Sequence, residues 1–228
     1  MKKIIFLLCI ISLLTACSAK KEKKIFQNEA TQVKSEQGEE EGQTALKNSS
    51  ENMKLNFGAH APSPQVSDDQ LLQKVGTSIT DSKGKLTLRA MNDSNIIEKI
   101  GPIKLEIKEI KMMNYRPDYS LIDFFHFYTH DEEFDLLKVK VELQNTSDHP
   151  VMFNPLAYLS IGNEKKSWLD DVYLEELNGV INGGEVRSGN IGFIVNWEDV
   201  NEVKIITSDA LDEAKKVISK GKNISLKL

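Results

Sequence analysis

Three stretches of the chain place an apolar residue at every second position. They are KLTLRAM (residues 85–91), PIKLEIKEI (102–110) and LLKVKVELQN (136–145). Successive side chains of a β-strand point to opposite faces, so alternation over six or more residues predicts strands with one buried face. In the third stretch, Val139 and Val141 would face a core, and Lys138 and Lys140 would face outward.

More strand candidates follow at short intervals, and turn-forming residues separate them. They are PVMFN (150–154), AYLSI (157–161), SGNIGFIVN (188–196), NEVKIIT (201–207) and a closing NISLKL (223–228). The stretch SIGNEKKSW predicts a hairpin around Gly162 and Asn163. Many short strands without regular alternation of strands and helices predict a mainly β fold, an antiparallel β-sandwich.

Two stretches depart from this pattern. YSLIDFFHFYTH (119–130) is rich in aromatic residues and is either a helical turn over the open end of the sandwich or an aromatic strand. SDALDEAKKVISKG (208–221) has a serine in the N-cap position and a glycine after a lysine-rich last turn. Because Leu211, Ala214 and Ile218 share one helix face, it predicts a short C-terminal helix.

The N-terminus has the parts of a secretory signal. Lys2 and Lys3 precede an apolar run over residues 4–14, which as a helix would rise about 16 Å and could not span a hydrocarbon core of about 30 Å. The run ends in LTAC (14–17), which resembles the bacterial lipobox. The resemblance implies cleavage after Ala16 and a diacylglyceryl thioether on Cys17, which anchors the protein on the extracytoplasmic face of the cell membrane. The alternative is a secreted protein with an incidental cysteine.

Cysteine usage and charge agree with an exported, lipid-anchored chain. The second cysteine, Cys9, lies inside the apolar run and would leave with residues 1–16, so the mature chain would hold no disulfide. Loss of Lys2 and Lys3 leaves 27 of the 29 Lys and Arg residues against 34 Asp and Glu, a net charge of −7. An acidic chain argues against nucleic acid as a partner.

Residues 17–84 are predicted to be a lipidated N-terminus and flexible linker. A group of lysines begins at Lys20, three residues after Cys17. The group forms a solvated spacer and can at the same time contact anionic lipid, which is worth up to about 1 kcal/mol for each lysine. The polar, glycine- and glutamate-rich stretch beyond them offers little to bury. SDDQLLQKVG (67–76) is one island of structure, a marginal helix that begins at Ser67 and either docks on the domain or frays. The folded domain is predicted to be residues 85–228.

Part of the predicted domain resembles a known family. The motifs are the KVKVEL strand that leads into NTSD (145–148), the PVMF stretch (150–153) and the NGGE turn (182–185). Over about residues 134–206 they resemble an uncharacterised immunoglobulin-like domain of Gram-positive lipoproteins, grouped with immunoprotective extracellular proteins. The resemblance implies an immunoglobulin-like fold. It implies no catalytic residues, because that family has no known activity.

Two groups of residues are candidate sites. His126 and His130 have the i, i+4 spacing of zinc proteases, but Phe127 stands where those enzymes have a glutamate, so two histidines on an aromatic cap are favoured over a metal or pH-sensitive site. Asp170 and Asp171 lie beside Trp168 and Tyr173, with Glu175 and Glu176 behind them. Without a calcium-loop pattern, this acidic patch favours a solvated loop.

The sequence therefore predicts a non-enzymatic module that binds a protein or ligand at the cell envelope. It predicts no catalytic, cofactor-binding or metal residues and no cofactor. Cys17 is the one predicted site, and the partners are the membrane, through the lipid, and an unknown envelope protein or ligand. A structural or stress-protective protein without a specific ligand and a metal-dependent hydrolase remain as alternatives.

Overall fold

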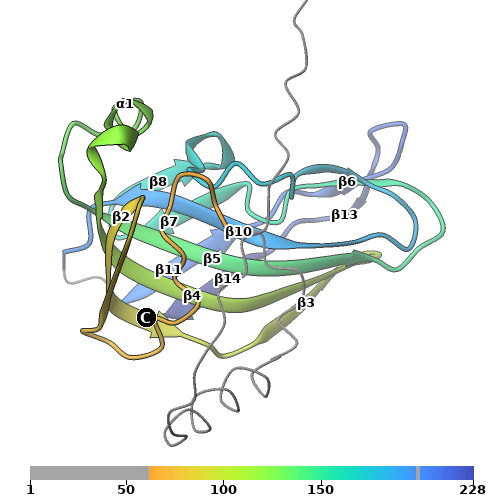
Figure 1. The fold of residues 1–228 in the computed structure, drawn as a ribbon. Coiled ribbons are helices and arrows are strands. Elements are labelled where there is room, and N and C mark those ends of the chain that lie inside the picture. The colour runs from red at the N-terminus through yellow and green to blue at the C-terminus, as the bar shows by residue number, and fades with distance from the viewer. Residues whose placement is uncertain (1–61, 199–200) are drawn as a thin grey trace, which may run out of the picture. The chain divides into compact units, whose positions relative to one another are not determined.

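The computed structural model describes residues 62–198 and 201–228. Strands dominate, and the helical elements are a single helix of four residues and two short 3-10 turns (Figure 1). In chain order the elements are β1 (Ser78–Asp81), β2 (Gly84–Asn92), β3 (Ile96–Ile100), β4 (Ile103–Pro117), η1 (Tyr119–Leu121), α1 (Ile122–Phe125), β5 (Phe134–Asn145), β6 (Val151–Phe153), β7 (Tyr158–Ile161), β8 (Glu164–Ser167), η2 (Trp168–Asp170), β9 (Gly179–Ile181), β10 (Val186–Val195), β11 (Glu202–Ile206), β12 (Ala210–Leu211), β13 (Val217–Ser219) and β14 (Asn223–Lys227).

The first layer is an antiparallel sheet in the order β1-β2-β4-β5-β10, with β3 also paired to β4. Strand β4 is 15 residues long, so one of its edges pairs with β3 over Ile103 to Ile107 and with β2 over Ile110 to Pro117. Its other edge pairs with β5. The three longest neighbours, β4, β5 and β10, run side by side across the molecule (Figure 1).

The second layer consists of two antiparallel sheets, β14-β11-β7-β8 and β13-β12-β6-β9. Backbone hydrogen bonds continue across the bend between them: the Ala157 amide donates to the Ile206 carbonyl at 2.9 Å, and the Ser208 amide donates to the Asn154 carbonyl at 3.0 Å. The two sheets therefore form one bent layer, in which β8 and β9 lie on the same edge. The predicted hairpin at Gly162 is confirmed, because it joins β7 to β8.

The main core lies between the two layers. The inward residues of β4 and β5 alternate with outward ones, as the period-two pattern predicts, and they pack on apolar residues of both second-layer sheets. Fully buried members include Leu105, Leu137, Val139, Phe153, Leu159, Phe193 and Val203. The predicted mainly β fold of antiparallel sheets, arranged as a sandwich, is confirmed.

A second, smaller core covers one end of the opposite face of the first sheet. Met113 and Leu136 point into this second core, whereas their chain neighbours Met112 and Leu137 point into the main core on the other face of the sheet. The aromatic stretch forms the helical turn η1–α1 and not a strand. It contributes Phe125 to this core, and the centroid of the Phe125 ring lies 5.5 Å from that of Tyr115 and 5.1 Å from that of Phe134.

The folded part of the chain begins before Lys85, where the sequence placed its start. Val66 and Leu72 are buried in the second core, and the Ser67 hydroxyl donates to the Asp81 carboxylate at 2.7 Å. Residues 67–76 dock on the sheet, but they do so without forming the predicted helix. Ser67 is drawn to Asp81 instead of capping a helix, and so short a helix has little stability of its own.

A buried ion cluster holds this N-terminal segment on the sheet. The Asp69 carboxylate accepts from the ammonium groups of Lys111, at 3.0 Å, and Lys138. Glu109 lies 3.1 Å from both lysines. Lys111 and Lys138 are only 1% and 3% exposed. Burial opposes ionisation of Asp69, but the two lysines overcome it and hold the pKa of Asp69 below its ordinary value.

The predicted C-terminal helix is wrong. Residues 208–221 form strands β12 and β13 with a tight turn between them, in which Lys215 has a φ of +60°. Ser208 bonds to Asn154 through both its amide and its hydroxyl, and Leu211 pairs with Met152 of β6. Sheet pairing with distant residues thus overrides a helical pattern carried by only three apolar positions.

The motifs that carried the family resemblance meet around one buried side chain. Asn145 is fully buried, and its amide donates to the carbonyls of His149 at 2.7 Å and Ile181 at 3.0 Å. Its side-chain oxygen accepts from the amide and hydroxyl of Ser147. The backbone of Gly184 also bonds to Asn145 at 3.0 Å. The two turns are therefore mutual structural supports.

Candidate binding site

The acidic patch lies at the bend of the second layer. Strands β8 and β9 end the two second-layer sheets, and residues 168–178 connect them. The loop begins with η2, which is closed by a capping box: the Asp170 carboxylate accepts from the Ser167 amide at 2.7 Å. This rigid turn leaves Trp168 and Leu169 on the surface, 43% and 70% exposed.

Asp171 fixes the loop to the edge of the first sheet. It is 6% exposed, and its carboxylate accepts from the backbone amides of Gly192 at 2.8 Å, Tyr173 at 3.0 Å and Leu174 at 3.2 Å. The Val172 amide in turn donates to the Gly192 carbonyl. Burial raises the pKa of the Asp171 carboxyl to about 6, against the three amide bonds, which favour the ionised form.

Leu174 is held in an uncommon conformation. Its φ of +57° lies in the left-handed region that non-glycine residues seldom adopt, and its side chain is 58% exposed. The neighbouring Tyr173 points inward instead, with its ring so close to Gly192 that a Cβ there would lie 2.5 Å from it. Strain of this kind persists where the surrounding structure imposes it, and it is concentrated at functional sites.

Glu175 and Arg187 also hold this loop against the neighbouring strands, and together with Asp170 and Asp171 they form the frame of the site. The Glu175 carboxylate accepts from the backbone amide and the side-chain amide of Asn190, at 3.1 and 3.0 Å. The Arg187 guanidinium donates to the Glu185 carboxylate at 2.6 Å, to the Asn178 carbonyl at 3.2 Å and to the Val180 carbonyl. Arg187 therefore ties β10 to the open edge of β9.

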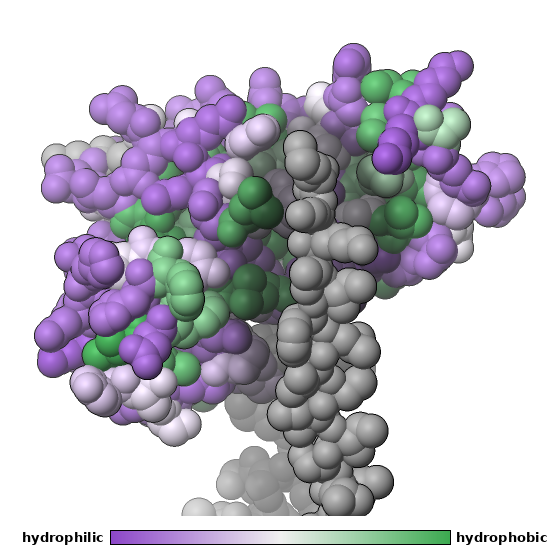
Figure 2. All heavy atoms as spheres, turned by 90° about the horizontal axis from the view of Figure 1, so that it is seen from above, coloured by the Kyte–Doolittle hydropathy of each residue, from purple (hydrophilic) through white to green (hydrophobic). Residues whose placement is uncertain are grey.

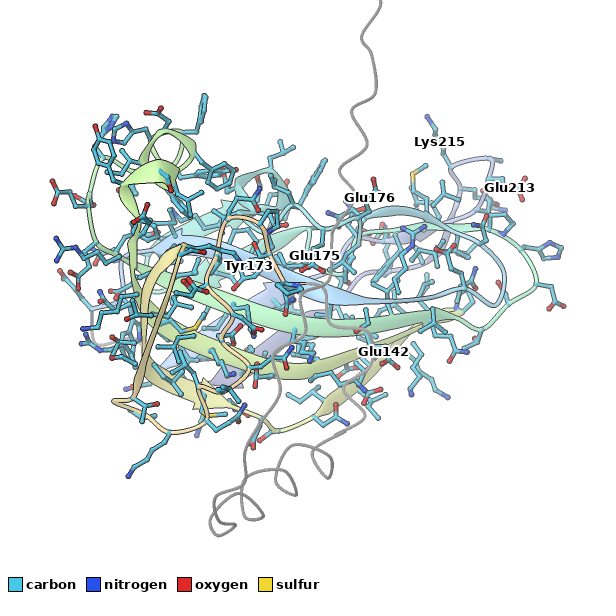
Figure 3. The ribbon with its side chains drawn as sticks, viewed as in Figure 1. Glu142, Tyr173, Glu175, Glu176, Glu213 and Lys215 are labelled. Atoms are coloured by element: carbon cyan, nitrogen blue, oxygen red, sulfur yellow. The ribbon has the colours of Figure 1, made fainter. Side chains whose placement is uncertain are left out.

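The frame encloses an open pocket of about 510 Å³, within the range of small-ligand sites. Its lining combines four exposed apolar side chains with three carboxyl groups, an amide and a guanidinium group. They are Trp168, Leu169, Leu174, Val180, Asp171, Glu175, Glu176, Asn178 and Arg187. Tyr173, Glu175 and Glu176 follow one another along this segment in Figure 3. From above, the surface is mostly hydrophilic, with hydrophobic residues in small separate patches (Figure 2).

The acidic patch is thus neither of the two arrangements weighed from the sequence. Its two aspartates diverge: Asp170 caps η2 at the surface, and Asp171 is buried and bonds to backbone amides. The pocket walls Leu169, Leu174 and Val180 were not singled out from the sequence. Their only signal was apolar residues between polar ones in a stretch without periodicity, and many surfaces share that signal.

The other predicted positions do not form a comparable site. His126 follows α1 and His130 lies in the next turn, with ring centroids 5.6 Å apart. Within residues 62–198 and 201–228, no three His, Cys, Asp or Glu side chains are grouped to hold a metal ion. No helix in this described part is long and apolar enough to cross a membrane. Cys17 and the signal sequence lie outside the described residues.

The comparisons with known proteins give relatives without an assigned activity. No protein-family model matches the sequence. The chain is 37% identical to the uncharacterised protein YdhF of Bacillus subtilis strain 168, over the full length of both. A functionally unknown protein from Listeria monocytogenes, of known crystal structure, aligns with a TM-score of 0.47 and 12% identity, over 64% of this chain and 88% of that one.

Proposed function

The chain belongs to the family of the uncharacterised Bacillus subtilis protein YdhF, and we propose that it is a non-enzymatic binding module, anchored by lipid on the extracytoplasmic face of the membrane. In this proposal Cys17 carries the lipid, residues 18–61 space the folded part from the bilayer, and the pocket beside Trp168 receives a partner. A disulfide-free, immunoglobulin-like sandwich then serves as a rigid frame for that pocket.

The observation that carries the binding part is the pocket itself. Four apolar side chains, each at least 43% exposed, surround one cavity. The hydrogen bonds that Asp170 and Asp171 accept and that Arg187 donates hold the surrounding loop in place. Exposed apolar groups cost solubility, and such a cluster on a rigid frame is typical of a binding site. The anchoring part rests on the order of a positive start, a short apolar run and LTAC at residues 14–17.

Metabolic labelling tests the anchor. Cells that express the protein are fed an alkyne fatty acid, and the label is detected on the purified protein. Wild type and Cys9→Ala should carry label, because Cys9 leaves with the signal, and Cys17→Ala should carry none. Equal labelling of Cys17→Ala would contradict the anchor.

Cross-linking in intact cells followed by purification tests the binding part. Wild type should retain one reproducible partner that Trp168→Ala loses. Tyr119→Ala is the matched control, because Tyr119 is an aromatic residue 86% exposed on a different element, η1. A diffuse set of proteins, equal in all three samples, would favour the structural or stress-protective role instead.

A further inference from the structure

Most of the charged groups that line the pocket are already bonded within the protein. Arg187, the one cationic residue of its lining, already donates to Glu185, Asn178 and Val180. Asp171 is likewise occupied by three backbone amides. The Glu175 carboxylate accepts two hydrogen bonds from Asn190. The Glu176 carboxylate is therefore the charged group of the lining that is left to pair with a ligand, and it favours a cationic donor.

The charge of the pocket has the same preference. Asp171, Glu175 and Glu176 contribute carboxyl groups, and the single positive charge of Arg187 is paired with Glu185. Glu176 is exposed at the rim, and it forms no ion pair with any other described residue. The lining thus carries more negative than positive groups, which favours a cationic ligand over an anionic one.

The walls add an apolar and aromatic component. Leu169, Leu174 and Val180 are 70%, 58% and 49% exposed, so a partner with apolar groups would cover them. Trp168 offers a ring face, the strongest aromatic partner for an ammonium or guanidinium group. Nearby, Lys165 already lies 3.9 Å from the ring centre of Tyr158.

From these observations we propose that the pocket binds a basic side chain, lysine or arginine, of an extended peptide segment whose neighbouring residues are apolar. This inference rests on the proposed function and names the chemistry of the partner. The basic group lies between the Glu176 carboxylate and the Trp168 ring. The neighbouring apolar residues cover Leu169 and Leu174.

Peptide titration tests the inference. The probes are three fluorescent octapeptides that alternate leucine with lysine, glutamine or glutamate, and the protein is the mature chain with Cys17→Ser. The lysine peptide should bind most tightly, and Glu176→Lys should weaken it roughly tenfold at low salt. Glu213→Lys makes the same charge change in the β12–β13 turn, far from Glu176 in Figure 3, and should leave the affinity unchanged.

The outcomes separate this inference from the proposed function. If the glutamine and glutamate peptides bind as tightly as the lysine peptide, or if no peptide binds, the basic partner is wrong. The binding role is overturned only if Trp168→Ala also keeps its partners in cells. If Glu213→Lys weakens the lysine peptide as much as Glu176→Lys does, the effect is general electrostatics and the assignment to the pocket is wrong. Far-UV circular dichroism of each variant confirms that it is folded.

Discussion

Replacing Asp69 by asparagine would leave the ammonium groups of Lys111 and Lys138 with one carboxylate, Glu109, between them. Both lysines are almost inaccessible to water, so neither can exchange its lost partner for solvent. Removing one member of a buried ion pair costs about 3–5 kcal/mol. Lys111 keeps the Asp69 carbonyl at 3.0 Å, and asparagine keeps one acceptor oxygen, so we expect a loss of about 3–4 kcal/mol.

The measurement is urea unfolding of the mature chain with Cys17→Ser, followed by circular dichroism. The control is Asp68→Asn, because it makes the same charge change one residue earlier and asparagine can still accept from the Gln70 amide. We expect the control to lose less than about 1 kcal/mol. Adding Lys138→Met to Asp69→Asn removes the excess charge and should restore part of the stability.

If Asp69→Asn lowers the free energy of unfolding no more than Asp68→Asn does, the ion cluster contributes little to stability. In that case the N-terminal segment would not be held on the sheet by a buried cluster.

Asn145→Ala removes hydrogen-bond donors and acceptors from a fully buried junction and should lower the free energy of unfolding by about 3 kcal/mol. Gln144→Ala, on the outer face of the same strand, is the control and should lower it by less than about 1 kcal/mol. Equal losses of stability in the two variants would contradict a structural role for the Asn145 junction. The folded-state pKa of Asp171, about 6, is raised above its ordinary value of 3.8, so its stabilising contribution is complete below the lower value and is lost as pH rises through the higher one. The stability of wild type relative to Asp171→Asn should therefore fall by about 2 kcal/mol between pH 4.5 and 7.5 in urea titrations, and a flat difference would contradict this. A chain that begins at Lys85 should unfold at lower urea than one that begins at residue 62, since it loses β1, Val66 and Leu72; identical midpoints would contradict the earlier start.

Long strands with one buried face could be predicted from the sequence. The alternation in β2, β4 and β5 reports burial on a single face, and that is a local property. The short strands β1, β3 and β9 were missed because their residues alternate too briefly, and neighbouring strands define them. The helix predicted at residues 208–221 failed for the same reason.

Lys138 shows where the pattern is right but incomplete. The alternation places it on the outer face of the first sheet, as the structure does. A lysine there is expected to be solvated, but the N-terminal segment covers this part of the face and buries it. Lys138 lies 69 residues after Asp69 in the chain, so no local sequence pattern relates the two residues.

The candidate site could be located in part. The acidic patch around Asp171 is visible in the sequence, because four acidic residues lie within seven positions. Its arrangement depends on Gly192 and Arg187, which belong to β10 and approach the loop only after the sheets form. The sequence gives the charge of the pocket, and tertiary structure gives its shape.

Site-specific photo-cross-linking in intact cells shows whether a partner contacts the pocket beside Trp168. A photoreactive amino acid replaces Leu169 at the pocket or Tyr119 on η1, both strongly exposed, and adducts are separated by mass after irradiation. We expect one discrete adduct from position 169, none from position 119, and loss of the first adduct when Trp168→Ala is added. Adducts that are absent at both positions, or the same at both, would contradict a binding site at this pocket.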